Sequence, residues 1–203
     1  MKNLVFIAVI CMIAFSGCNQ SKPVKTIENL KAGIIGETTA SAKYAAFAQK
    51  AQEEGYSNIA ILFEAASKAE SIHATNHKKV LEGLGEKMDD FTPEFEVKTT
   101  AENLQAAIEG ESYESSTMYP QFLEDAKIEK VEKATKSFNW ALDTEKKHQK
   151  FYSNSLEALN SVTENTLPAE FAVCPVCGNT YDIATLDDKC AFCQTSKEKF
   201  ISI

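Results

Sequence analysis

The sequence predicts an all-α protein, in which a four-helix bundle is followed by a small domain held together by a metal ion. The central part of the chain has long stretches rich in Ala, Glu, Lys and Leu and no run of alternating polar and apolar residues, which favours helices over strands. Two Cys-x2-Cys pairs lie close to the C-terminus. A chain of 203 residues has room for one ordinary domain and a small appended one.

The first residues are typical of a bacterial lipoprotein signal peptide. Lys2 is followed by an apolar run from Leu4 to Phe15, which is too short to cross a bilayer core of about 30 Å as a helix. Small residues then stand directly before Cys18. We therefore expect a signal peptide over residues 1–17, a lipid on Cys18 and a short tether over residues 18–25. The alternative is an apolar N-terminus that is not cleaved.

The charge composition restricts the partners. The formal net charge is -8, and all 21 basic residues are lysine. Nucleic-acid binding normally needs a basic face and arginine forks, so we expect no nucleic-acid partner. We expect contact with a membrane only through the lipid, which would anchor the chain on the extracytoplasmic, periplasmic side of a bacterial membrane.

The bundle is expected to span residues 26–160. The predicted helices cover residues 26–54, 57–84, 98–126 and 129–159. Each would extend roughly 40 Å at about 1.5 Å per residue, which is the scale of a four-helix bundle. Pro120 predicts a kink in the third helix, because proline removes a backbone hydrogen bond. Trp140 and the phenylalanines are expected in the core.

An internal repeat relates the two halves of the bundle. Glu28-Asn29-Leu30 precedes Glu37 by nine residues, and Glu102-Asn103-Leu104 precedes Glu111 by the same distance. A glycine stands directly before Glu37 and before Glu111. These glycines, at positions 36 and 110, either permit close helix approach or are simply tolerated, at a cost of about 1 kcal/mol each relative to Ala.

Each half also carries a Glu-x-x-His motif on its second helix, at Glu70 to His73 and at Glu145 to His148. The i, i+3 spacing places both side chains on one helix face, and two such motifs with one Glu from each remaining helix form the ligand set of di-iron and di-manganese bundles. The predicted ligands are Glu37, Glu70, His73, Glu111, Glu145 and His148. The alternative is a set of solvated glutamates with incidental histidines. His77 has no counterpart in the second half, so we do not assign it as a ligand.

Four cysteines near the C-terminus predict a second metal site. Cys174, Cys177, Cys190 and Cys193 have the pattern C-x2-C-x12-C-x2-C, which suits a tetrahedron of thiolates. The domain expected over residues 168–203 is shorter than about 40 residues, a length at which a hydrophobic core alone rarely suffices. Zinc and a single iron ion both suit this spacing, and disulfides are the alternative outside the cytoplasm.

These motifs together resemble the rubrerythrin family. The resemblance covers the chain after the tether and rests on Gly36-Glu37, Glu70 to His73, Gly110 to Glu114, Met118-Tyr119-Pro120, Glu145 to His148 and the cysteine pairs. It implies a ferritin-like bundle that binds two iron ions and a C-terminal rubredoxin-like domain with one iron or zinc ion. It also implies a peroxidase that reduces hydrogen peroxide to water and protects against oxidative stress.

The resemblance further assigns roles to individual residues. Glu70 and Glu145 would bridge the two metals. One iron would shift between Glu114 in the oxidised state and His73 in the reduced state.

Two tyrosines and a second subunit complete what the resemblance implies. Tyr44 and Tyr119 match tyrosines that line the site and hydrogen-bond ligands or peroxide, with plain core packing as the alternative. Head-to-tail homodimers would place the cysteine-bound iron of one chain beside the di-iron site of its partner. The electron donor is unidentified.

Some features depart from the family pattern and leave other functions open. Asn179 stands where rubredoxin-like domains commonly have an aromatic residue, and Tyr181 is expected to replace its packing. Lipid export differs from the cytoplasmic location of familiar members. A ferroxidase or other iron-handling bundle, which needs no relay, is one alternative function. A non-enzymatic module with a zinc knuckle is the other.

Removing the metals is expected to lower the melting temperature of the bundle near neutral pH. Two divalent ions balance the charge of four buried carboxylates, and without the ions the carboxylates crowd together and take up protons. Thermal unfolding of loaded and chelator-stripped protein, followed by circular dichroism, checks this. An unchanged melting curve after complete removal would contradict a buried site.

Overall fold

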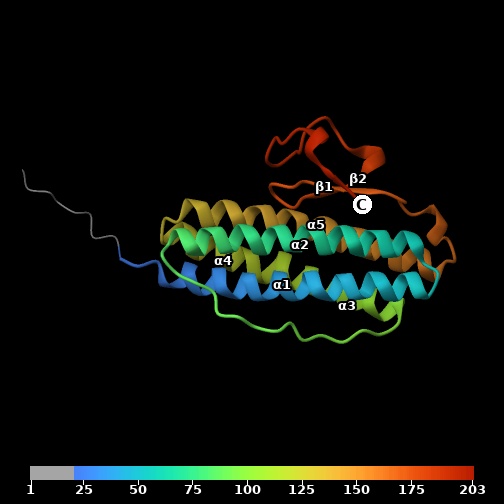
Figure 1. Cartoon of the computed structure of the whole chain (residues 1–203), viewed down its shortest axis with the longest axis horizontal. Helices are drawn as coiled ribbons and strands as arrows, with labels where there is room; N and C mark the ends of the chain where they lie inside the picture. Colours follow the sequence, from blue (N-terminus) through green and yellow to red (C-terminus); the bar gives the residue numbers. More distant parts are fainter. Residues whose placement is uncertain (1–20) are drawn as a thin grey trace, which may run out of the picture.

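The computed structural model describes residues 21–203, and a bundle of long helices makes up most of it (Figure 1). The helices are α1 (Val24–Glu53), α2 (Ser57–Gly83), α3 (Thr100–Tyr113), α4 (Tyr119–Ile128) and α5 (Glu132–Asn160). The predicted signal peptide and Cys18 lie outside the described residues. Among the described helices, none is long and apolar enough to cross a membrane.

The third predicted helix is interrupted rather than only kinked. A π-helical turn, η1 (Glu114–Met118), separates α3 from α4, and Pro120 lies in the first turn of α4. Proline lacks an N–H group and its ring clashes with the carbonyl four residues earlier in an α-helix. The wider π-turn directly before Pro120 accommodates both effects. The other three helices begin and end within a few residues of the predicted positions.

The connections between the helices set the topology. Gly55, at φ +88°, closes the short turn between α1 and α2, which run antiparallel. Residues 84–99 instead run in extended form along the outside of α1, from one end of the bundle to the other (Figure 1). Because of this crossover α2 and α3 point the same way, which is the connectivity of ferritin-like bundles.

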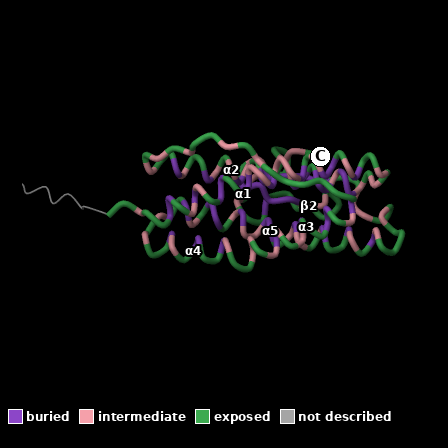
Figure 2. The backbone as a smooth tube through the Cα atoms, turned by 90° about the horizontal axis from the view of Figure 1, so that it is seen from below, coloured by how far each residue is buried: buried purple, intermediate pink, exposed green. Residues whose placement is uncertain are grey.

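The core consists of two apolar clusters with a polar layer between them. Along α1, residues 27–34 belong to one cluster and residues 40–51 to the other, and the buried Glu37 lies between them. The same order occurs on α5, where Phe138 and Tyr152 flank the buried Glu145. Figure 2 shows buried positions recurring along the inner faces of the helices. The helices therefore fix the polar residues at mid-length.

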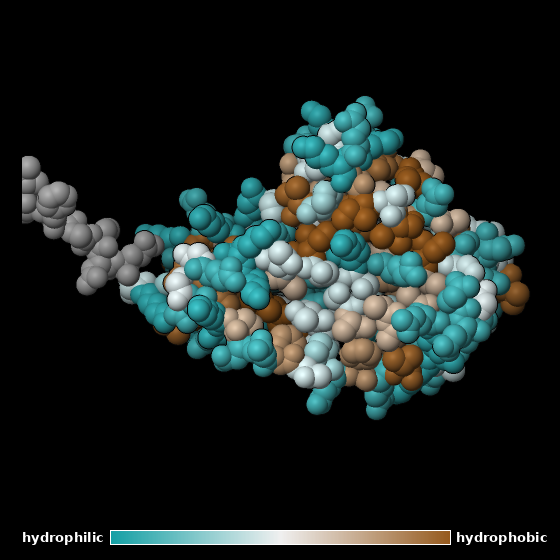
Figure 3. Space-filling model, viewed as in Figure 1, coloured by the Kyte–Doolittle hydropathy of each residue, from teal (hydrophilic) through white to brown (hydrophobic). Residues whose placement is uncertain are grey.

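The C-terminal domain is docked on the flank of the bundle formed by α2 and α5 (Figure 1). Its strands β1 (Phe171–Val173), β2 (Thr180–Asp182) and β3 (Ile201–Ser202) form an antiparallel sheet in the order β2-β1-β3. Phe171 and Val173 belong to one of the apolar clusters of the bundle, and the Phe171 ring lies 5.3 Å from that of Phe151. Figure 3 shows apolar surface gathered at this junction.

Two aromatic residues, Tyr181 and Trp140, pack against the cysteines of the C-terminal domain. Tyr181 packs against the cysteines, as predicted, and its ring lies 5.6 Å from that of Phe200. Trp140 was expected in the core, which is wrong. Its side chain is partly exposed and packs against the cysteine cluster, because the face of α5 that carries it meets the C-terminal domain.

Replacing Thr99 by Ala should lower the free energy of unfolding of the metal-free protein by about 1 kcal/mol. The Thr99 hydroxyl accepts a hydrogen bond from the backbone of Glu102, and the Glu102 carboxylate accepts one from the backbone of Thr99, so the pair caps α3. Urea denaturation checks the loss. Thr99→Ser keeps the hydroxyl and should be close to wild type; equal losses in both variants would contradict the cap.

Candidate metal centres

The six predicted ligands of the bundle converge in its polar layer, and each is at most 1% exposed. They come from α1, α2, α3 and α5 and form two groups whose possible ligand atoms lie within 4.8 Å of one another. The first group is Glu37, Glu70, His73 and Glu145, and the second is Glu70, Glu111, Glu145 and His148. The alternative of solvated surface glutamates is therefore wrong.

Glu70 and Glu145 belong to both groups and have the geometry of bridging carboxylates. His73 Nδ1 lies 2.9 Å from Glu70 Oε2 and 3.1 Å from Glu145 Oε1. His148 Nδ1 lies 2.9 Å from Glu70 Oε1 and 3.2 Å from Glu145 Oε2. Each carboxylate thus presents one oxygen to each group.

Orphaned polar atoms show that the donor set fits two cations. Glu37 Oε2, Glu70 Oε1, Glu111 Oε2, both Glu145 oxygens and His148 Nδ1 are buried and have no hydrogen-bond partner. Unpaired buried groups of this kind are costly, and native proteins rarely keep them without a ligand. Two ligand atoms that each lie about 2.1 Å from one metal ion, at a right angle, stand roughly 3 Å apart. This matches the separations of 2.9, 3.1, 2.9 and 3.2 Å between the histidine nitrogens and the shared carboxylate oxygens.

The far nitrogens of both ligand histidines are bound by the C-terminal domain. His73 Nε2 donates to the Cys177 carbonyl oxygen at 3.1 Å. His148 Nε2 lies 2.8 Å from the hydroxyl of Thr180, and this hydroxyl donates to the Gly178 carbonyl at 3.4 Å. Since these partners take the Nε2 protons, both Nδ1 atoms keep a free lone pair for a metal.

The two predicted tyrosines are fully buried, and each donates to the glutamate of the other half. The Tyr44 hydroxyl donates to Glu111 Oε1 at 2.7 Å, and the Tyr119 hydroxyl donates to Glu37 Oε1. Burial, and next the charge of these partners, raises the pKa of both tyrosines well above the ordinary value. Both therefore stay protonated donors, so the plain-packing alternative is insufficient.

Glu114 lies at the start of the π-turn and outside both ligand groups. A Cβ atom built on Gly36 would lie 4.0 Å from Glu114 Oε1, an ordinary contact. A Cβ on Gly110 would lie 3.9 Å from Lys43 Nζ. Neither glycine is therefore needed for close helix approach, and both are simply tolerated in their helices.

The close approach occurs instead at Gly33, where a Cβ atom would lie 3.0 Å from Cδ2 of His77. His77 is fully buried and belongs to neither metal group. Its Nε2 lies 3.0 Å from the Tyr119 hydroxyl, and its Nδ1 lies 2.7 Å from the Ser137 hydroxyl. Ser137, His77, Tyr119 and Glu37 thus form one hydrogen-bonded chain, and Ser137 is a member that the sequence did not reveal.

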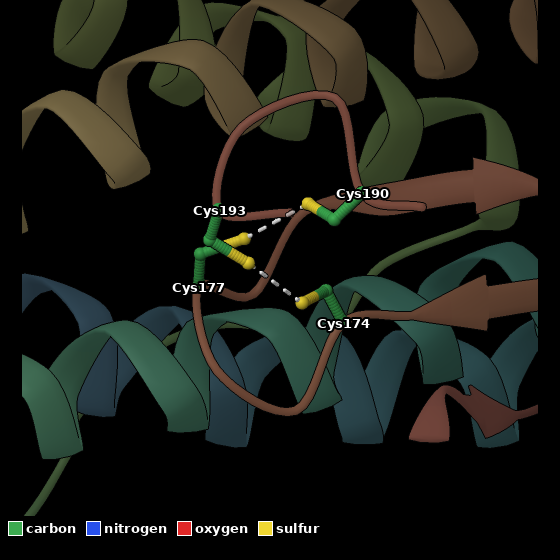
Figure 4. A group of neighbouring side chains, drawn as sticks. All are labelled: Cys174, Cys177, Cys190 and Cys193. Atoms are coloured by element: carbon green, nitrogen blue, oxygen red, sulfur yellow. Dashed lines mark hydrogen bonds between the residues drawn. The ribbon is translucent and has the colours of Figure 1, made fainter. Parts of the chain in front are cut away.

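The four cysteines form the third candidate centre (Figure 4). All four thiols are free, with sulfur separations of 3.4 Å between Cys174 and Cys193 and 3.5 Å between Cys177 and Cys190. A disulfide would require about 2.05 Å, so the disulfide alternative is wrong. The Tyr181 hydroxyl donates to Cys190 Sγ at 3.3 Å. Three of the sulfur-bearing residues are buried, and Cys193 is partly exposed.

Comparison with known proteins agrees with this pairing of centres. The sequence model of the rubrerythrin family matches residues 28–156. The chain belongs to the rubrerythrin family. It is 33% identical to rubrerythrin-2 of Clostridium acetobutylicum over 88% of this chain and 97% of the relative. It is 36% identical to nigerythrin of Nitratidesulfovibrio vulgaris over 86% of this chain and 85% of the relative.

The fold of solved relatives supports the same assignment. A structure of nigerythrin in a mixed-valence state has a TM-score of 0.79 and 32% identity, and the match covers 100% of both chains. Rubrerythrins are di-iron oxidoreductases of oxidative-stress defence and carry a further iron centre at rubredoxin-like cysteines. The expected family, fold and cofactors are confirmed.

The electrostatics of the rubrerythrin centre depend on burial and on carboxylates facing histidines. Burial, with the charges of Glu145 and Glu70, raises the pKa of Glu37 to about 8 and that of Glu111 well above its ordinary value. Burial alone would lower the pKa of His148, but the carboxylates around it raise this pKa to about 9. Without metal, Glu37 and His148 therefore both hold protons at neutral pH.

The metal-free protein should lose thermal stability as the pH rises from about 6 to about 9. Both groups have a higher pKa in the folded protein than in the unfolded chain, so the folded protein binds protons more tightly and protonation stabilises it. This stabilisation is lost as the pH rises through about 8 for Glu37 and about 9 for His148. Melting temperatures measured across this range check the trend. Glu37→Gln should flatten it, and a metal-free melting temperature that rises with pH would contradict it.

Proposed function

We propose that this rubrerythrin reduces hydrogen peroxide to water, with two electrons and two protons consumed for each peroxide and two waters formed. The observation that carries the proposal is the sharing of Glu70 and Glu145 between two ligand groups. Bound iron would supply the electrons for O–O cleavage from two ions held side by side. A two-electron acceptor such as peroxide suits such a pair.

The surroundings of the site favour a small reactant and a supply of protons. All six ligands of the polar layer are buried, so a bulky substrate would not reach them without unfolding the bundle. Tyr44 and Tyr119 stand ready as hydroxyl donors on Glu111 and Glu37. Their protonated state suits them to donate hydrogen bonds to a departing oxygen and to restore protons to the carboxylates.

The four-cysteine centre distinguishes this function from a ferroxidase. Oxidation of soluble Fe(II) delivers its own electrons and needs no relay, whereas peroxide reduction consumes electrons that must come from a donor. The partly exposed Cys193 gives such a donor access to the cysteine-bound ion. A zinc-bearing binding module would not need the buried hydroxyl donors.

Location at the cell envelope belongs to the same proposal and is supported by sequence alone. The pattern around Cys18 predicts a lipid anchor facing the extracytoplasmic side. A homodimer also stays a prediction. Labelling with a radioactive fatty acid tests the first, and sedimentation equilibrium of the iron-loaded protein tests the second.

Peroxide should oxidise the prereduced protein faster than oxygen does. Replacement of Glu145 by Gln should slow the peroxide reaction at least about 100-fold, because mutating a residue that only hydrogen-bonds a metal ligand already lowers metal affinity or activity about 10–100-fold. Stopped-flow absorbance measures both rates. Glu157→Gln, an exposed change on the same helix, is the matched control and should leave the rates unchanged. Faster oxidation by oxygen than by peroxide would favour the ferroxidase.

A further inference from the structure

The hydrogen-bonded chain from Ser137 to Glu37 has a direction. The Tyr119 hydroxyl donates to Glu37 Oε1, so its oxygen accepts from His77 Nε2, 3.0 Å away. Burial, and next the charge of His73, lowers the pKa of His77 to about 3, so this imidazole is neutral and its Nδ1 carries no proton. Nδ1 therefore accepts from the Ser137 hydroxyl at 2.7 Å. Each donor in the chain thus points toward the di-iron site.

The outer end of the chain reaches a surface pocket between α2 and α5. The pocket has a volume of about 280 Å³, and Ser137 is the one member of the chain that lines it. The three inner members are fully buried, whereas Ser137 is 4% exposed. Three ammonium groups stand around the same pocket, those of Lys79, Lys133 and Lys136. Solvent therefore meets the chain at the Ser137 hydroxyl.

The imidazole of His77 is held in the orientation that the chain needs. A Cβ atom at Gly33 would lie 3.0 Å from His77 Cδ2, so only glycine leaves room for the ring there. The ring of Phe138 packs edge-on against the imidazole, with 5.1 Å between the centroids. Neither neighbour offers a hydrogen bond to a ring nitrogen, so both nitrogens are left to the two hydroxyls.

We propose that Ser137, His77 and Tyr119 conduct protons from this pocket to Glu37 at the di-iron site. The proposal rests on the proposed function, which consumes two protons for each peroxide, and it names the place where these protons enter the bundle. Ser137 hydrogen-bonds none of the six predicted ligands, so it acts through the two residues between it and Glu37.

One passage moves one proton and no electron. A hydronium ion in the pocket protonates the Ser137 oxygen, and Ser137 gives its own proton to His77 Nδ1. The Nε2 proton passes to the Tyr119 oxygen, and the Tyr119 proton passes to Glu37. The hydronium ion becomes water and Glu37 gains a proton. Before the next passage the two hydroxyls rotate and the imidazole returns to its Nε2–H tautomer.

Two substitutions of nearly the same shape at Ser137 test this route. Ser137→Thr keeps the hydroxyl, whereas Ser137→Val has a methyl group in its place, and both side chains are β-branched. The iron-loaded, full-length variants are reduced and mixed with peroxide, and their oxidation is followed by stopped flow in H2O and in D2O. We expect Ser137→Val to react at least about tenfold more slowly than Ser137→Thr. Its solvent deuterium isotope effect should be larger, because proton supply then limits the rate.

Equal rates in the two variants would overturn the proposal. A slower Ser137→Val variant without a larger isotope effect would overturn it as well, because a loss of packing alone slows the reaction in that way. The comparison is repeated with oxygen as the oxidant, since its reduction also consumes protons. The wild-type rates with the two oxidants test the proposed function, whereas the difference between the variants tests the proton route with either oxidant.

Nitrogen NMR tests the direction of the chain without any reaction. In the full-length, zinc-loaded protein labelled with ¹⁵N-histidine, which is diamagnetic, the chemical shifts show which ring nitrogen carries the proton. We expect a protonated Nε2 and an unprotonated Nδ1 for His77, whose signals are those missing from His77→Gln. A proton on Nδ1 would overturn the proposal, because the Ser137 hydroxyl would then have no acceptor on the ring.

Discussion

The whole structure depends on keeping four carboxylates together in a dry interior. Glu37, Glu70, Glu111 and Glu145 are at most 1% exposed, and several of their oxygens have no hydrogen-bond partner. Each isolated charge in such a place would cost several kcal/mol, at an order of magnitude, unless cations balance it. The two apolar clusters on either side hold the carboxylates in place, so packing stabilises an arrangement that only metal ions make favourable. The same metal ions are therefore needed for the stability of the bundle and for its chemistry.

The two halves of the bundle place a tyrosine beside the site with segments of different length. Tyr44 follows Glu37 by seven residues, which is two α-helical turns, whereas Tyr119 follows Glu111 by eight. The π-turn between Glu111 and Tyr119 absorbs the additional residue, so both tyrosines reach the glutamate of the opposite half. The same turn carries Glu114, the one acidic residue of the motif without a counterpart in the first half.

Local periodicity made most of the bundle predictable. The Glu-x-x-His spacing and the repeat placed the ligands on inward helix faces, and the cysteine spacing predicted the tetrahedral cluster, because both patterns act within a few residues. The π-turn was missed, although the seven-against-eight spacing of the tyrosines indicates it. The partners Ser137 and Thr180 lie 60 and 32 residues from the histidines that they bind. Such contacts depend on how helices and domains dock, which no local pattern encodes.

The crossed tyrosine–glutamate pairs and the shared bridging carboxylates make each half of the bundle dependent on the other. Neither half, taken as two helices, holds a complete set of donors for even one of the two groups. A polypeptide of half this length would build the site only by associating with a second copy about a twofold axis. The extended crossover of residues 84–99 joins the two halves covalently, so the two helix pairs that supply the donors meet within one chain and this step does not depend on protein concentration. The halves are nevertheless not identical, because the second carries one extra residue between its glutamate and its tyrosine, and the π-turn accommodates that residue.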